Sequence, residues 1–288
     1  MVIREKAYAK INISLDVTGK REDGYHEMVM IMQTVSLCDE LTLTIRESGG
    51  VFARSSLRFI PGDDRNLAVK AAVNYLKAIG EPEKGVRIDI RKRIPVGAGM
   101  GGGSADAAAV LRGLNRAFGN RLSQQELIAL AADTGSDVVF CLVGGTMLAT
   151  GRGERLTPLP PMPPCSITVC KPEFSISTPE LFRKLDSVHV KGHPDTKGLV
   201  SALKEGSLPE LCRRMYNVFE DVGDRRMRTV GHIKGRLLDH GALGSVMTGT
   251  GSAVFGVFKE REQAERACAE LKKEYGLCCV TEAVGRLL

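Results

Sequence analysis

The sequence predicts an α+β fold divided into two domains, and three observations support this prediction. A chain of 288 residues, 43% hydrophobic and 26% charged, has the composition of a globular protein. Segments typical of strands and of helices are mixed, without the regular alternation that a parallel α/β fold requires. Five prolines fall within residues 157–164, where they exclude a helix or an inner strand. We therefore expect a boundary there, with domains at 1–157 and 165–288.

The N-terminal half has patterns typical of four strands and three helices. Alternating and β-branched residues favour strands, and the turn residues Lys20 to Gly24 join the first two into a long hairpin. Helical periodicity predicts two helices, and Ser123-Gln-Gln-Glu126 is a capping box that opens a third. We expect strands at 7–17, 27–37, 41–46 and 86–90, and helices at 66–79, at about 104–118 and from 123. After Asp137, the runs VVFCLV and TMLAT are expected to be buried elements that close this domain.

The C-terminal half mixes helices with antiparallel strand patterns. Its first helix is expected at Thr178, with Pro179 at the first helical position. Further helices are expected near 208–220 and 224–240 and at 260–275, and strands at 166–170, 243–248, 253–258 and 277–284.

Charge and composition narrow the classes of function. The 40 Lys and Arg against 34 Asp and Glu give a net charge of +6, which suits an anionic small ligand. No basic tail or aromatic-interleaved basic patch predicts nucleic-acid binding. No apolar run approaches the ~18 residues of a membrane helix, and the N-terminus lacks the apolar stretch of a signal peptide. The eight cysteines show neither CxxC nor zinc spacing. We expect a cytoplasmic protein with reduced thiols and no evident obligate protein partner.

The most informative segment is PVGAGMGGGSADAAA at 95–109, where five glycines precede an alanine-rich helix. Glycines can bring several N–H groups onto one phosphate, and the N-terminus of the helix adds further donors and positive dipole charge. A flexible linker is the alternative. The spacing satisfies GxGxxG, but a second helix follows where a dinucleotide-binding unit would return to a strand. Ser104-Ala105 replaces the Lys-Ser or Lys-Thr of a P-loop.

Three motifs carry a resemblance to a known family. PVGAGMGGGSADAAAVL resembles the second motif of the GHMP kinase superfamily, a group of small-molecule kinases that bind ATP through this loop. AYAKINISLDV, near the N-terminus, resembles the first motif, and MTGTGSAVFGVF at 247–258 resembles the third. The three occur in the family's order across nearly the whole chain.

The resemblance implies an architecture and a co-substrate. Mixed sheets packed on helices would form an ATP-binding domain at 1–157 and a ferredoxin-like α+β domain at 165–288, with the active-site cleft between them. ATP would be the co-substrate and Mg²⁺ is implied, although no carboxylate cluster in the sequence identifies its ligands. The implied ATP-binding residues are Pro95, Val96, Gly97, Ala98, Gly99, Met100, Gly101, Gly102, Gly103, Ser104 and Ala105.

Two residues are candidates for catalysis. Phosphoryl transfer to an alcohol needs a group that takes the hydroxyl proton, and Asp137 precedes an apolar run that could partly desolvate its carboxylate. Strand periodicity puts Lys10 on the same face as Asn12, where it could favour the ionised Asp137 and stabilise the transferring phosphoryl group. The resemblance places the catalytic aspartate and lysine at these positions. A capping Asp and a solvated strand lysine are the structural alternatives.

The acceptor is indicated by AKINISLDVTGKREDGYHEM, whose most specific part is Gly24-Tyr25-His26. Within the superfamily this stretch implies a cytidine-diphosphate-linked polyol. Asn12 and His26 would then hydrogen-bond the cytidine and Tyr25 would lie against its base. The other substrate residues implied are Phe182 on the other face of the base and Thr248, Gly249, Thr250 and Gly251 near the diphosphate.

Other interpretations of the acceptor residues stay open. Tyr25 and His26 could be ordinary residues beside a turn, Phe182 could serve helix packing, and the third motif could be a plain hairpin. Asn217 is close to a family position near the substrate but receives no role. At the level of function, the alternatives are another GHMP kinase, such as a homoserine kinase, and a non-catalytic nucleotide-binding sensor.

Overall fold

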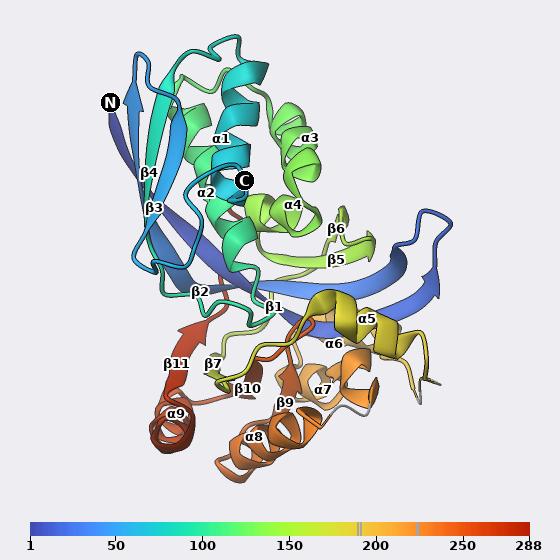
Figure 1. Ribbon diagram of the computed structural model, residues 1–288. Coiled ribbons are helices and arrows are strands. Elements are labelled where there is room, and N and C mark those ends of the chain that lie inside the picture. The colour runs from blue at the N-terminus through green and yellow to red at the C-terminus, as the bar shows by residue number, and fades with distance from the viewer. Residues whose placement is uncertain (189, 191, 223–224) are drawn as a thin grey trace.

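Two sheets organise the chain in the computed structural model, which describes residues 1–188, 190, 192–222 and 225–288 (Figure 1). In these residues the first sheet has seven strands in the order β3-β4-β2-β1-β8, with β5 paired to β2 and β6 paired to β5. Its strands are β1 (Val2–Lys20), β2 (His26–Arg46), β3 (Val51–Ser55), β4 (Gly85–Arg91), β5 (Thr146–Gly151), β6 (Arg155–Pro158) and β8 (Tyr216–Asn217). The second sheet is antiparallel, and its strands in order are β11 (Leu277–Glu282), β7 (Ser166–Lys171), β10 (Val254–Phe258) and β9 (Gly244–Met247). The predicted α+β class is confirmed.

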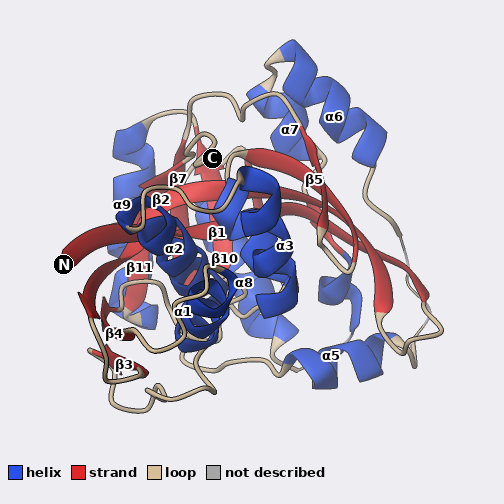
Figure 2. Cartoon of the chain, turned by 90° about the horizontal axis from the view of Figure 1, so that it is seen from above, coloured by secondary structure: helices blue, strands red, loops and turns tan. Residues whose placement is uncertain are grey.

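Helices cover both sheets. Four helices lie on one face of the first sheet: α1 (Leu67–Ala78), α2 (Gly102–Ala117), α3 (Gln124–Thr134) and α4 (Ser136–Val143). Figure 2 shows α1, α2 and α3 on this side of β1 and β2. Ala105, Ala107, Ala108 and Ala109 are at most 1% exposed, because their small side chains let α2 approach the sheet and its neighbours closely. The remaining helices are α5 (Thr178–Leu185), α6 (Thr196–Glu205), α7 (Leu208–Arg213), α8 (Met227–Asp239) and α9 (Arg261–Tyr275).

The strands of the first hairpin are longer than expected. Residues 27–37 and 41–46, predicted as two strands, belong to the single strand β2. The polar residues Cys38-Asp39-Glu40 suggest a break, but Asp39 is fully buried and its Oδ1 accepts hydrogen bonds from the backbone N–H groups of Arg93 and Ile94. A satisfied carboxylate can stay inside the sheet, so the strand continues.

In the C-terminal half, the helix predicted at 208–220 is wrong beyond its first turns. It ends as α7 at Arg213, and Tyr216–Asn217 then pairs with β1 before a 3₁₀ turn at Val218–Val222. Pairing with a distant strand overrides the local helical preference. Helix α6 was not predicted. The helix expected at 224–240 is α8 in its described part, with residue 224 outside the described residues.

The outer edge of β1 is covered by arginine side chains. In the described part of the chain, β1 pairs on this side only through Ser14 and Leu15, which face β8. Arg112 of α2 donates to the carbonyl of Lys6 at 2.9 Å, and Arg116 donates to the carbonyl of Arg4 at 3.4 Å. These two carbonyls of the edge are therefore occupied by side chains from the helix layer.

The end of the chain returns to the first sheet. Residue Val35 forms a bridge with Ala283, and Gly144 forms one with Arg286. The backbone N–H of Leu287 donates to the carbonyl of Val143, at the end of α4, at 2.8 Å. Because this tail and β8 both join the N-terminal sheet, contacts cross the expected boundary, and the division at 157–165 stays a prediction.

Candidate active site

Three segments far apart in sequence meet at one point of the fold. The backbone N–H of Lys10 donates to Met100 O at 3.1 Å, which joins β1 to the glycine loop. The N–H of Ala253 donates to Ala98 O at 3.2 Å, and the N–H of Asn12 donates to Thr248 Oγ1 at 3.0 Å. Hydrogen bonds thus connect the three motifs directly.

The glycine loop lines a cavity of about 580 Å³ together with both halves of the chain. Gly97, Gly99 and Gly101 have φ of 63°, 73° and 68°, which L side chains rarely adopt. A Cβ on Gly99 would lie 2.1 Å from Thr248 O, so only glycine permits this approach of the two loops. Helix α2 begins after Gly101 without a side-chain cap, which leaves its first N–H groups directed to the cavity as anion donors.

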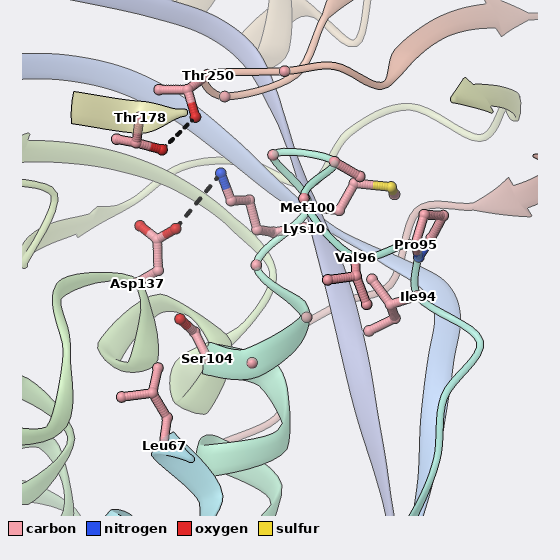
Figure 3. Close-up of a pocket in the computed structure, with 18 of the residues that line it drawn as sticks. Lys10, Leu67, Ile94, Pro95, Val96, Met100, Ser104, Asp137, Thr178 and Thr250 are labelled. Atoms are coloured by element: carbon pink, nitrogen blue, oxygen red, sulfur yellow. Dashed lines mark hydrogen bonds and ion pairs between the residues drawn. The ribbon is translucent and has the colours of Figure 1, made fainter. Parts of the chain in front are cut away.

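Lys10 and Asp137 face one another across this cavity (Figure 3). Lys10 Nζ lies 3.7 Å from Asp137 Oδ2 and donates to Asn12 Oδ1 at 2.6 Å. The Lys10 side chain is 5% exposed and that of Asp137 is 35% exposed, so the lysine is fixed while the carboxylate is accessible to a substrate. Asp137 lies in the first turn of α4, where the helix dipole stabilises negative charge.

A buried ion cluster lies under the glycine loop, and no motif of the sequence predicts it. Lys92 Nζ lies 2.5 Å from Asp39 Oδ2 and 2.7 Å from Asp106 Oδ2, in the first turns of α2. Burial raises the pKa of Asp106 to about 7; the Lys92 ammonium opposes this rise and the Asp39 carboxylate adds to it. The cluster links β2, the strand end before the loop, and the helix after it, and so holds both ends of the loop.

A second cavity, of about 420 Å³, adjoins the first and contains the predicted acceptor residues Tyr25 and His26. Both cavities share Met28, Arg152, Thr178 and Phe182 as wall residues. Phe182 stacks on the His26 ring with a centroid distance of 4.5 Å and an interplanar angle of 25°. In this structure Phe182 therefore packs against His26, while Tyr25 is 57% exposed beside it.

Asp186 also lines this second cavity, and it lies outside the motifs that the sequence contains. Its Oδ1 lies 2.6 Å from His26 Nε2, and its Oδ2 accepts from Lys20 Nζ at 2.7 Å. These hydrogen bonds lower the pKa of Asp186. Because a carboxylate only accepts, His26 Nε2 carries the hydrogen, and Nδ1 is the acceptor in the neutral ring.

The third motif forms the wall opposite Asp137. Thr250 Oγ1 lies 2.9 Å from Thr178 Oγ1, at the start of α5, as Figure 3 shows. Asn217 Nδ2 donates to Met247 O at 2.7 Å and to Gly249 O at 2.8 Å. Asn217, left without a role by its sequence, thus supports the backbone of this loop.

Most of the predicted site residues line the two cavities. Pro95 to Ser104, Lys10, Asp137 and Gly249 to Gly251 line the first, Tyr25 and His26 the second, and Phe182 both. Asn12, Ala105 and Thr248 are at most 1% exposed and lie behind the wall, where Asn12 and Thr248 bond to wall residues. They support neighbouring residues in this structure.

A glycine loop that faces a lysine–aspartate pair, beside a second cavity for an acceptor, is the arrangement of a small-molecule kinase. The family model described as GHMP kinases N terminal domain matches residues 66–145, and that described as GHMP kinases C terminal matches residues 199–277. The 4-diphosphocytidyl-2-C-methyl-D-erythritol kinase of Caldicellulosiruptor saccharolyticus is 46% identical, over 93% of this chain and 92% of its own length. The protein of that name from Bacillus subtilis is 45% identical, over 99% and 96%. The chain belongs to the GHMP kinase family, and within it to the 4-diphosphocytidyl-2-C-methyl-D-erythritol kinases.

Solved structures agree with this assignment. A crystal structure of 4-(cytidine 5'-diphospho)-2C-methyl-D-erythritol kinase is 35% identical with a TM-score of 0.82, and the alignment covers 98% of this chain and all of that one. A homoserine kinase from Cytophaga hutchinsonii has a TM-score of 0.75 at 21% identity, covering 99% and 95% of the two chains. The second likeness shows the fold alone.

Two further properties concern only the residues described above. No helix among them is long and apolar enough to cross a membrane. They also contain no group of three or more His, Cys, Asp or Glu side chains placed to hold a metal ion.

Proposed function

We propose that the protein transfers the γ-phosphoryl group of ATP to the 2-hydroxyl of 4-diphosphocytidyl-2-C-methyl-D-erythritol, in the non-mevalonate route to isoprenoid precursors. The observation that carries the proposal is the position of Lys10 and Asp137 in the glycine-loop cavity, next to the cavity of Tyr25 and His26. ATP in the first cavity and the cytidine in the second would bring the two reacting groups to Asp137.

In this mechanism Asp137 acts as the general base. The acceptor oxygen attacks the γ-phosphorus in line with the leaving group, its proton passes to the Asp137 carboxylate, and the bond between the γ-phosphorus and the bridging oxygen of ADP breaks. The 35% exposure of the Asp137 side chain supports this role, since a base must reach the hydroxyl.

Lys10 and the glycine loop stabilise the charge that develops on the transferred group. The Lys10 ammonium donates to Asn12 Oδ1, and the backbone N–H of Lys10 donates to Met100 O, so the position of the residue needs no reorganisation during the reaction. The N–H groups at the start of α2 hold the phosphates of ATP.

Mg²⁺ fits this site as a metal bound mainly by phosphate. The Ser104 hydroxyl lines the cavity beside the glycine loop, and hydroxyl and phosphate oxygens are ligands that Mg²⁺ prefers (Figure 3). When bound, Mg²⁺ would neutralise charge on the phosphates. We further propose that the enzyme works in the cytoplasm and without an obligate protein partner.

An assay of ADP release with a panel of acceptors tests the proposal. We expect turnover with 4-diphosphocytidyl-2-C-methyl-D-erythritol and none above background with homoserine. In the proposed function the Tyr25–His26 cavity binds a nucleobase, and homoserine has no nucleobase. Turnover of homoserine without the cytidyl substrate would identify a different kinase. ATP binding without turnover of any acceptor would favour the nucleotide sensor.

A further inference from the structure

Arg152 lies where the two cavities meet. It is one of four residues that line both of them, and it is the basic one among these four. It lies in the turn between β5 and β6, outside the three motifs of the sequence. The sequence analysis assigned it no role.

The turn that carries Arg152 passes next to Asp137. Gly151 and Gly153 have φ of 73° and 106°, and the backbone N–H of Arg152 donates to Glu154 Oε2 at 2.6 Å. A Cβ on Gly153 would lie 3.9 Å from Asp137 Oδ1, so the turn passes close to the proposed base. Arg152 therefore lies between the cavity of Tyr25 and His26 and the part of the first cavity that contains Asp137.

The charge of Arg152 has no carboxylate partner within ion-pair distance among the residues that the structure describes. Its guanidinium carbon lies 5.0 Å from the centroid of the Tyr25 ring, a cation–π contact that orients the side chain and leaves its N–H donors for other groups. A half-buried guanidinium with unused donors at the wall of a cavity is suited to an anion.

We propose that Arg152 binds the diphosphate of the acceptor. This inference rests on the proposed function, in which the cytidine occupies the cavity of Tyr25 and His26 and the polyol hydroxyl reaches Asp137. The diphosphate joins these two parts and must pass the junction where Arg152 lies. A guanidinium matches phosphate oxygens with two parallel N–H donors, which a lysine cannot do. The cation–π contact would at the same time join diphosphate binding to the position of Tyr25 against the base.

The test compares cytidine with cytidine 5'-diphosphate (CDP) as ligands of the wild-type protein and of Arg152→Ala. We expect the variant to lose about 10- to 100-fold in affinity for CDP, the range of a hydrogen-bonded charge pair, and less than about 3-fold for cytidine. KM for the cytidyl substrate should rise by a similar factor, while KM for ATP stays unchanged. Arg152→Lys should recover part of the loss, because it restores the charge without the paired donors.

Arg155→Ala is the matched control. Arg155 is exposed, lies three residues away on β6, and lines neither cavity, so its removal takes the same charge from the same hairpin. We expect wild-type affinities from it. A loss of the same size in both arginine variants would show a general charge effect and overturn the inference.

Other outcomes separate the inference from the proposed function. If Arg152→Ala loses affinity for cytidine and CDP equally, Arg152 acts only through Tyr25. If the variant loses affinity for ATP alone, Arg152 acts on the phosphoryl donor. Either result overturns the inference. If Arg152→Ala keeps wild-type turnover and wild-type affinity for CDP, the inference is overturned but the proposed function stands. A wild-type protein that neither binds CDP nor uses the cytidyl substrate would remove both.

Discussion

At the scale of residues, the site separates a fixed cation from an accessible base. Lys10 is buried and bound by Asn12, whereas Asp137 is open to the cavity. This difference in exposure is what the proposed mechanism requires, in which Asp137 takes the proton of the acceptor and Lys10 contacts the transferred group.

Asp137→Asn is expected to lower kcat by about 10²- to 10⁴-fold, the range of a lost general base, with ATP affinity changed little. The amide has the same shape but does not take a proton. Steady-state ADP release gives kcat, and titration with a non-hydrolysable ATP analogue gives the affinity. Asp133→Asn removes an exposed carboxylate near the end of the preceding helix α3; it is the control and should behave as wild type. An unchanged kcat in Asp137→Asn would exclude the role as base.

Some of the candidate site residues could be predicted from the sequence because they lie in local motifs. Lys10, Asp137 and the glycines are each identified within a short stretch, and the structure brings them to one cavity. Asp186 and Arg152 could not be found in this way. Their positions depend on contacts with residues 160 and 127 positions away, His26 and Tyr25, which only the folded chain creates.

At the scale of elements, the glycine loop depends on two distinct properties of glycine. Gly99 needs both a left-handed backbone and the absence of a side chain, since the loop packs against Thr248. Gly119, which follows the end of the same helix, has φ of 74° but nothing within 4 Å of an added Cβ.

This pair predicts different outcomes for the same substitution. Gly119→Ala should cost about 1 kcal/mol of stability from backbone strain and leave KM for ATP unchanged. Gly99→Ala carries the same strain and also forces the two loops apart, so KM for ATP should rise at least about 10-fold. Thermal denaturation and ATP titration of both variants measure the two effects. Equal KM values in the two variants would contradict a role for the close loop contact.

Element boundaries were predictable where local signals decide them. The capping box at Ser123 and Glu126 is present, and the strands predicted at 243–248 and 253–258 form β9 and β10. The stretch after Arg213 differs because its backbone bonds are made with β1, about 200 residues earlier in the chain. Its sequence continues the helical pattern of α7 and contains no motif that predicts pairing with β1.

At the scale of the whole molecule, the C-terminal tail supports the helix that carries Asp137. Val284 N–H donates to Thr34 O at 2.8 Å, and Leu287 contacts both Val143 and Gly144 at the end of α4. Residues near the last position thus stabilise an element of the N-terminal sheet layer.

Deletion of residues 284–288 is therefore expected to lower the apparent Tm by about 5 °C, through the loss of about 2 kcal/mol of hydrogen bonds and apolar burial. Thermal denaturation of the ligand-free protein measures the shift. Removal of Leu288 alone serves as the control, because its N–H makes only a long contact of 3.4 Å with Val143 O. An unchanged Tm after deletion of all five residues would show that the tail does not contribute to the stability of the fold.

The arginines along the edge of β1 also affect how the molecule behaves among its copies. An open strand edge offers carbonyl groups on which a second chain can add a strand, and long edges of this kind start aggregation. Arg112 and Arg116 already use the carbonyls of Lys6 and Arg4 and place two cations there. An incoming strand would have to displace both side chains, so residues 4–6 of β1 are shielded from edge-to-edge association.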